Sequence, residues 1–184
     1  MIDTIIQDNS NKRIMEPFTA VYTNKEVIVP NQSEADSIYQ DGYGYRKNQV
    51  HYLRAVEVLY NIERGKIVVV DEESNKKLSF QELLHLLISD DSELWINFIV
   101  YKDLRTRGFI IEISEKIYRV FERGDYRKKP ASYQLKIISE GKPETIQKIM
   151  EELEKVEEET LEMKIAVVDR RGEIVYYGVN ERDL

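Results

Sequence analysis

The first part of the chain alternates short apolar runs with residues that favour turns. Phe18 to Thr23 and Glu26 to Val29 are rich in strand-forming residues, and Asn24 and Lys25 separate the two runs. This pattern predicts a short β-hairpin, because β-branched and aromatic residues favour strands and a two-residue break favours a tight turn. Pro30 then ends the second strand.

Helical periodicity begins after a glycine-rich stretch. From Lys47 to Arg64 the apolar residues recur at helical spacing, and Gly65 supplies the stop that commonly ends a helix. The members of this apolar stripe are Val50, Leu53, Val56, Leu59 and Tyr60. We therefore predict a helix over residues 47–64, followed by a buried strand from Lys66 to Val70.

Two more helices are predicted before residue 108. Ser79 and Glu82 form a capping box ahead of an apolar run, and the next helix covers about Ser92 to Arg107 and ends at Gly108. Five apolar residues of this last helix are expected to point inward: Leu94, Trp95, Phe98, Ile99 and Tyr101. We place the end of a first, mixed α/β domain there, so that this domain spans residues 1–108.

The remaining residues, 109–184, predict a second small α/β domain with a central mixed sheet. Three strand-like runs, Phe109 to Ile113, Ile117 to Phe121 and Tyr133 to Ile138, precede a helix that Pro143 and Glu144 open. The apolar stripe of this helix is Ile146, Ile149, Met150, Leu153 and Val156, with the glutamates mostly opposite. Two final strands, 164–168 and 174–178, flank a tight turn, so the predicted fold class is α+β or α/β with two small domains.

Composition limits the chemistry of the chain. With 42% hydrophobic and 33% charged residues, it has the profile of a soluble globular protein. The absence of cysteine excludes disulfides and thiolate chemistry, and two separated histidines, His51 and His85, are too few for a structural zinc site. We expect no metal, no cofactor, no membrane segment and a cytoplasmic location.

The charge is distributed unevenly along the sequence. A net charge of -7 argues against nucleic acid as a partner, because phosphate binding depends on lysine and arginine. The stretch from Tyr101 to Lys136 is nevertheless rich in lysine and arginine, whereas Glu144 to Glu162 holds eight glutamates against two lysines. The acidity is therefore local, and a basic region remains available for phosphate.

Several motifs occur in an order typical of one family. They are YGYRKN with HYLRAVEVLYNIERGKI, then LSFQELL, VYKDLRTRGFII, FERG and IAVVDRRGEIVYY. Over roughly Tyr43 to Tyr177 the chain resembles the archaeal tRNA-splicing endonucleases, whereas the first forty residues resemble no family. Members of that family cut precursor tRNA without a metal, using a ribose 2′-hydroxyl as nucleophile. The resemblance implies a tyrosine as general base, a histidine as general acid and a lysine that stabilises the pentavalent phosphorus.

The positions implied for these three side chains hold residues that cannot do this work. Alignment on FERG places the tyrosine position at Phe121, and alignment on the following strand places the histidine position at Pro130 or its neighbours Lys129 and Ala131. The lysine position falls at Leu161. A phenyl ring, a pyrrolidine and an isobutyl group neither transfer protons nor carry charge. We therefore expect this chain alone to be inactive.

The resemblance also implies partners. Some crenarchaeal members are heterotetramers of two catalytic and two structural subunits, and this chain looks like the structural subunit, with precursor tRNA as the substrate of the complex. The implied subunit interface is the final turn and strand: Asp169, Arg170, Arg171, Gly172, Glu173, Ile174, Val175, Tyr176 and Tyr177. The corresponding turn in the family is usually more acidic, so Arg170 and Arg171 depart from the pattern.

Other residues offer weaker candidates for RNA contact. Arg127, Lys128 and Lys129 are expected in a loop near the vacated catalytic position, with a solvated loop as the alternative. Tyr43 and Tyr45 lie on a glycine-rich turn and suit either base stacking or a structural turn.

Two other functions remain open. One is an active RNA endonuclease with a site rebuilt from Tyr118, Lys129 and Lys164, although the odd offset of Lys164 from Leu161 turns it to the other face of a strand. The other is a free-standing RNA-binding or assembly protein.

Overall fold

The computed structural model describes residues 16–114, 117–142 and 144–179. The N-terminal part comprises β1 (Phe18–Thr23), β2 (Glu26–Val29), α1 (Gln32–Gln40), β3 (Tyr45–Lys47), β4 (Val50–Leu53), α2 (Ala55–Glu63), β5 (Ile67–Asp71), β6 (Lys77–Leu78), α3 (Phe80–Ile88) and α4 (Leu94–Thr106). The C-terminal part comprises β7 (Ile110–Ser114), β8 (Ile117–Phe121), β9 (Tyr133–Ser139), α5 (Ile146–Glu158), β10 (Glu162–Val168) and β11 (Ile174–Val179).

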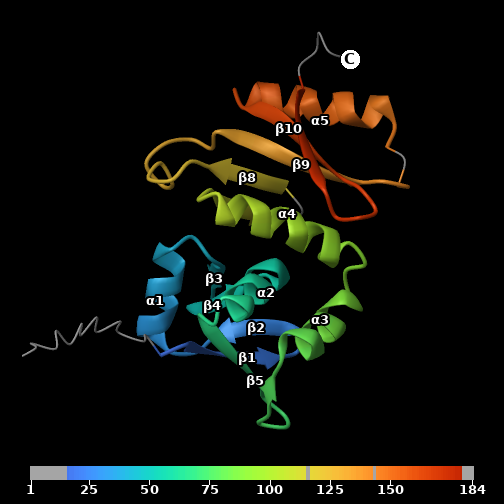
Figure 1. The fold of residues 1–184 in the computed structure, drawn as a ribbon. Coiled ribbons are helices and arrows are strands. Elements are labelled where there is room, and N and C mark those ends of the chain that lie inside the picture. The colour runs from blue at the N-terminus through green and yellow to red at the C-terminus, as the bar shows by residue number, and fades with distance from the viewer. Residues whose placement is uncertain (1–15, 115–116, 143, 180–184) are drawn as a thin grey trace, which may run out of the picture.

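These elements form two sheets, one in each part of the chain (Figure 1). The strand order is β3-β4-β2-β1-β5-β6 in the first and β11-β10-β9-β8-β7 in the second. Both sheets are mixed, because β1 and β5 run parallel, as do β9 and β10, whereas the other neighbours are antiparallel. The predicted fold class, a mixed α/β structure with an N-terminal and a C-terminal part, is confirmed.

The predicted N-terminal hairpin is confirmed as β1 and β2. Asn24 and Lys25 connect the strands with φ angles of 49° and 65°. Two successive positive φ angles give the turn a twist that matches that of the flanking strands. The predicted capping box is also present, because the backbone N–H of Glu82 donates to Ser79 Oγ and the backbone N–H of Ser79 donates to the Glu82 carboxylate.

The helix predicted from Lys47 is wrong over its first eight residues. Residues 45–53 form the β3–β4 hairpin instead, with Asn48 and Gln49 at φ angles of 50° and 66°. β4 also pairs with β2, and its alternate residues His51 and Leu53 are buried whereas Val50 and Tyr52 are partly exposed. Val50 and Leu53, three residues apart, fit the helical spacing, but pairing with β2 makes the segment a strand in which they lie on opposite faces. The helix begins only at Ala55.

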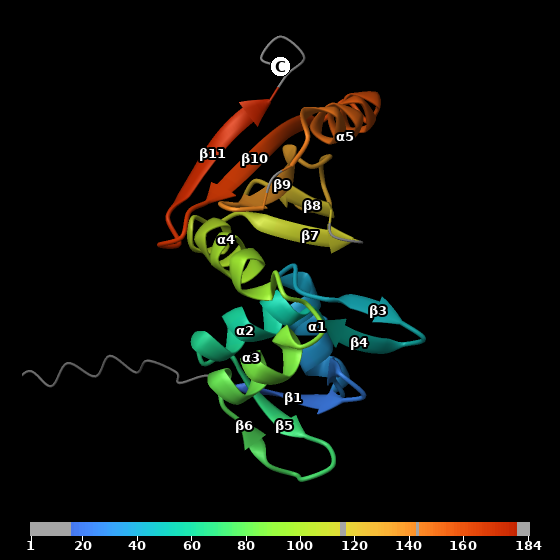
Figure 2. The same ribbon diagram turned by 90° about the vertical axis from the view of Figure 1, so that its right-hand side faces the viewer.

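α4 lies between the two sheets and packs against elements of both parts (Figures 1 and 2). Of the five residues expected to point inward, Leu94, Phe98 and Tyr101 are buried, but Trp95 is 44% exposed. Val100 and Leu104 are buried as well, because the helix has neighbours on opposite sides. The domain boundary predicted at Gly108 stays a prediction. The buried core continues through α4 from one part of the chain to the other.

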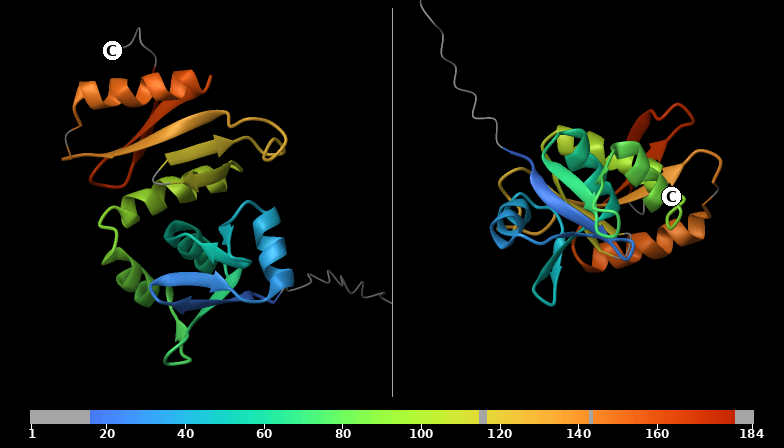
Figure 3. Two further views of the ribbon diagram at one scale, coloured as in Figure 1. Left: turned by 180° about the vertical axis from the view of Figure 1, so that it is seen from behind. Right: turned by 90° about the horizontal axis from the view of Figure 1, so that it is seen from below.

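α5 covers the face of the C-terminal sheet that lies opposite α4 (Figure 3). Its Leu153 and Val156 pack against Met163 and Ile165 of β10. Two members of the predicted apolar stripe are not covered: Ile146 is 61% exposed and Met150 is 43% exposed. Pro143, predicted to open this helix, lies outside the described residues. No helix among the described residues is long and apolar enough to cross a membrane.

Candidate functional site

Three neighbouring strands bring the sequence-predicted catalytic positions to one end of the C-terminal sheet. Phe121 is the last residue of β8, Pro130 lies in the loop just before β9, and Leu161 directly precedes β10. Val120 pairs with Tyr133 on one side, and Tyr133 pairs with Glu162 on the other. The sheet therefore gathers three positions that are up to 40 residues apart in the sequence.

The side chains at these positions make packing contacts or face solvent. Phe121 is 7% exposed and meets Tyr126 edge to face, with ring centroids 5.2 Å apart. Leu161 packs against the apolar cluster beneath α5, and Pro130 is exposed. None of the three carries a group that can donate, accept or hold a proton.

Lys164 lies on the opposite face of the sheet from Leu161. Its Nζ is 4.0 Å from the centroid of the Tyr133 ring, and that ring meets Phe109 edge to face. Leu161 instead joins the cluster on the α5 side. Alternation along β10 accounts for the difference, because residues an odd number apart point to opposite faces of a strand.

The residues of the alternative, rebuilt site do not come together. Tyr118 lines a groove with Glu93 and α5 residues, Lys164 lines a pocket beside Arg107, and Lys129 lines a third cavity. Burial also raises the pKa of the Tyr118 hydroxyl, which makes it a weaker acid than a free tyrosine. This arrangement does not favour a rebuilt catalytic triad within one chain.

The loop between β8 and β9 carries the three basic residues predicted to contact RNA. Arg127, Lys128 and Lys129 are all exposed, and Arg127 has a left-handed backbone with φ of 61°. Lys129 makes an exposed ion pair of 3.1 Å with Asp125. The guanidinium of Arg127 instead reaches α1, where it lies 3.7 Å from the centroid of the Tyr39 ring and donates to the Tyr39 carbonyl.

β11 forms one edge of the C-terminal sheet and carries the predicted interface strand (Figure 2). Val175 and Tyr177 point away from the core and are 50% and 55% exposed. Tyr176 points inward, where its hydroxyl donates to Asp103 at 2.7 Å, and burial raises its pKa. The edge therefore exposes apolar side chains beside backbone groups that face away from β10.

The turn before β11 is organised by its own acidic residue. The Asp169 carboxylate accepts hydrogen bonds from the backbone N–H groups of Arg171 and Glu173, each at 2.8 Å. Arg170 lies 3.6 Å from Glu140 in an exposed ion pair. Gly172 has a φ of 84° and packs near Ile99 of α4. The turn is thus a structured loop, in which Asp169 is already engaged within the chain.

A basic cleft at the junction of the two parts was missed by the sequence analysis. Arg64, Lys66, Arg105 and Arg123 line this cavity of about 370 Å³ together with Tyr43. The Arg105 guanidinium lies 4.0 Å from the centroid of the Tyr43 ring and donates to the Asp41 carbonyl at 3.0 Å. Only the fold reveals the cluster, because its members are scattered over 60 residues of sequence.

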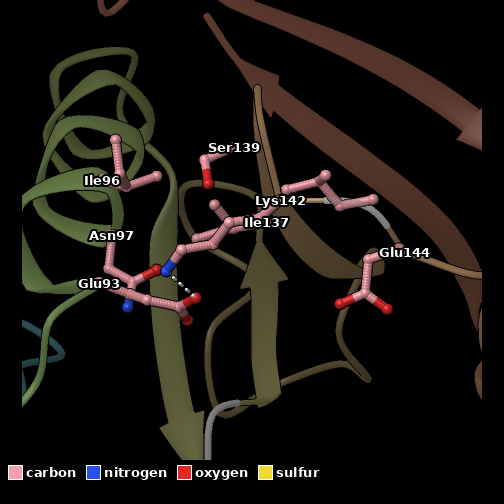
Figure 4. Close-up of a pocket in the computed structure, with 8 residues that line it drawn as sticks. Glu93, Ile96, Asn97, Ile137, Ser139, Lys142 and Glu144 are labelled. Carbon is pink, nitrogen blue, oxygen red and sulfur yellow. Dashed lines mark hydrogen bonds and ion pairs between the residues drawn. The ribbon is translucent and has the colours of Figure 1, made fainter. Parts of the chain in front are cut away.

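A smaller cavity between α4 and the end of β9 is a structural junction (Figure 4). Lys142 and Glu93 form a 2.8 Å ion pair across it, whereas Glu144 lies apart on the other side. Within the described ranges no three histidine, cysteine, aspartate or glutamate side chains gather as they would around a metal ion.

Family comparisons agree with this architecture. Residues 19–84 match the family model of the tRNA intron endonuclease N-terminal domain, and residues 94–176 match that of the tRNA intron endonuclease catalytic C-terminal domain.

Individual relatives point to the same family. A tRNA-splicing endonuclease of Pyrococcus furiosus is 31% identical over 162 residues, covering 86% of this chain and 89% of the relative. That of Methanococcus vannielii is 29% identical over 163 residues, covering 87% and 92%. The chain is also 31% identical over 157 residues to the enzyme of Methanococcoides burtonii, covering 84% of this chain but only 44% of that longer relative. The chain therefore belongs to the tRNA-splicing endonuclease family.

Proposed function

We propose that this chain is the non-catalytic, structural subunit of a tRNA-splicing endonuclease of the crenarchaeal heterotetrameric type. Two copies would assemble with two catalytic subunits in the cytoplasm, and the complex would excise introns from precursor tRNA at bulge-helix-bulge sites without a metal. The observation that carries this proposal is the set of side chains at the three strand ends: Phe121, Pro130 and Leu161.

The chemistry of RNA cleavage explains why these residues matter. Loss of a general acid or base typically lowers the rate by about 10²- to 10⁴-fold. Loss of one electrostatic stabiliser lowers it by about 10²- to 10³-fold. The effects are not additive, but a site that lacks all three groups has no means of moving a proton at the scissile bond.

Two surfaces support a role in assembly. The open edge of β11 can extend the sheet through backbone hydrogen bonds to a strand of the catalytic subunit, with Val175 and Tyr177 adding apolar contact. The basic cleft around Arg105 and Arg123 suits an acidic turn supplied by a partner, because four cationic side chains line it. We assign residues 1–108 and 109–184 to the two domains of this subunit, with α4 packed between them.

A cleavage assay tests the proposal. The purified chain should give no product from a bulge-helix-bulge precursor tRNA, whereas the chain mixed with a catalytic paralogue should release the intron. The variant Tyr118→Phe should leave the activity of the complex unchanged. Cleavage by the chain alone, lost on Tyr118→Phe, would instead establish the rebuilt active site and end the structural-subunit proposal.

Co-expression separates a subunit from a free-standing RNA-binding protein. With a catalytic paralogue present, we expect a stable complex of two copies of each chain, measured by size exclusion with light scattering. Elution of the two proteins as separate species would favour the free-standing role.

A further inference from the structure

A groove between the two parts of the chain unites residues that the sequence analysis treated separately. It has a volume of about 410 Å³. Its walls include Tyr39, Tyr45 and Arg46 from the N-terminal part, and Tyr126, Arg127 and Lys129 from the C-terminal part. Tyr45 and the Arg127 loop had each been considered for RNA contact, and the fold places them on one surface although they are about 80 residues apart in sequence.

Aromatic rings and guanidinium groups alternate along this groove. The guanidinium of Arg127 lies 3.7 Å from the Tyr39 ring centroid and 4.8 Å from that of Tyr126. Arg46 lies 4.8 Å from the Tyr39 centroid, so two guanidinium groups share that ring. Bases of single-stranded RNA stack on both kinds of plane, on aromatic rings and on guanidinium groups.

The charges of the groove favour an anionic ligand. Arg46, Arg127 and Lys129 line the groove together with one carboxylate, that of Glu112, and Arg46 forms an exposed ion pair with Asp36 beside it. Within the described residues Arg127 takes part in no ion pair, and Lys129 has only its exposed pair with Asp125. An exposed pair of this kind contributes little stability, so a phosphate can replace the carboxylate at small cost.

We propose that this groove binds a single-stranded segment of RNA, with phosphates on the basic side chains and an unstacked base against a guanidinium plane or the ring of Tyr45. On Tyr45 the base takes the place of the Arg54 guanidinium, which lies 4.6 Å from the ring centroid. The inference rests on the proposed function, because it names the part of the subunit that would hold the precursor. Phe121 forms part of the same wall, so the RNA passes the vacated catalytic position and is held there without being cut. An acidic protein segment would use the positive charges but not the aromatic planes.

The contribution of charge is tested with two matched lysines. Lys129 and Lys25 are 67% and 70% exposed, and each pairs with one aspartate, but Lys25 lies in the β1–β2 turn away from the groove. Binding of a short fluorescein-labelled oligouridylate to the full chain is followed by fluorescence anisotropy over a salt series. We expect Lys129→Glu to weaken binding and lower the salt dependence by about 0.7 log units per log unit of salt for each lost phosphate contact, and Lys25→Glu to change neither.

The contribution of stacking is tested at Tyr45. Tyr45→Ala should weaken binding by about 5-fold to about 100-fold without changing the salt dependence, since base stacking is not electrostatic. Tyr45→Phe keeps the ring and should bind like the unmodified chain. Thermal melts of both variants show whether the loss of the Tyr45 ring stacked on Tyr52, at 5.5 Å, has unfolded the hairpin. If it has, Lys129→Glu, at an exposed position, still decides the question.

The outcomes separate this inference from the proposed function. If Lys129→Glu binds RNA no more weakly than Lys25→Glu, the groove is not an RNA site, whatever the chain assembles with. An acidic peptide that displaces the RNA, and binds Tyr45→Ala as tightly as the unmodified chain, would assign the groove to a protein partner. That result would also overturn the inference. RNA binding that depends on Lys129 in a chain that forms no complex with a catalytic subunit would support the groove and contradict the structural-subunit role.

Discussion

At the scale of single residues, the glycine-rich turn before β3 is a point where backbone conformation and packing both restrict the sequence. Gly44 has a φ of 75°, and a Cβ there would collide with the Tyr52 carbonyl oxygen and lie 2.6 Å from His51 Nε2. Gly65 has a similar φ of 65°, but a Cβ there would have no neighbour within 4 Å. Substitutions at the two glycines therefore distinguish the free-energy cost of a left-handed backbone from the additional cost of a steric clash.

We expect Gly65→Ala to lower the free energy of unfolding by about 1–2 kcal/mol, the cost of a left-handed conformation for a residue with a Cβ. Gly44→Ala should cost about 1–3 kcal/mol more, because the hairpin backbone must also move. Urea denaturation of the two variants measures the difference. Equal losses would show that the β3–β4 hairpin shifts freely to make room.

Single residues also show how much of the candidate site could be predicted from the local sequence. That Phe121 and Leu161 lack catalytic groups is evident from the sequence alone, because side-chain chemistry does not depend on the fold. The local role of Asp169 could not be predicted in the same way. Its carboxylate accepts two backbone hydrogen bonds within its own turn, a preference of aspartate that is local but depends on the turn geometry.

At the scale of elements, capped and strongly patterned segments formed as predicted. α3 follows its capping box, and β1 and β2 follow the alternation of their residues. The segment 47–54 was mispredicted because a strand that pairs with β2 and a helix that continues into α2 have overlapping apolar patterns. A partner strand about 25 residues away in sequence decided between them.

The exposed edge strand β11 gives the sharpest test of assembly. We expect Val175→Asp and Tyr177→Asp to weaken association with a catalytic subunit at least about tenfold, because a charge would be buried in an apolar contact between strands. The monomer should remain folded, since both side chains are already half exposed.

Ile117→Asp is the matched control for these substitutions. Ile117 is 39% exposed on β8 of the same sheet but lies away from its β11 edge. Analytical ultracentrifugation of the mixed subunits measures all three variants. Equal weakening by the Ile117 substitution would assign the effect to general loss of stability.

At the scale of the whole molecule, α4 is the wall that the two parts share. Phe98 and Leu104 belong to one continuous buried core with residues of both sheets, including Ala20 of β1 and Ala166 of β10. In the sequence, a helix that is buried on two opposite sides is taken for an ordinary amphipathic helix, because the sequence does not show the second element against which it packs.

Fragments of the chain test whether the domain division falls at Gly108. A fragment of residues 109–184 lacks α4, so Ile111, Val120 and Leu135 would lose their cover, and we expect it to remain unfolded by circular dichroism and amide exchange. A fragment of residues 92–184 keeps the helix and should show cooperative unfolding. A folded 109–184 fragment would place α4 wholly in the first domain.

The sequence by itself determined the secondary structure of its well-patterned segments, the family and the side-chain chemistry at Phe121, Pro130 and Leu161, because motifs, caps and side-chain chemistry are local properties. Only the tertiary structure decided that residues 45–53 form a hairpin, that Trp95 faces solvent, and that Tyr45 and Arg127 share one groove. Each of these depends on which segments meet across the chain. Pairing between strands and burial from a second side are non-local, and a linear pattern of apolar residues does not specify them.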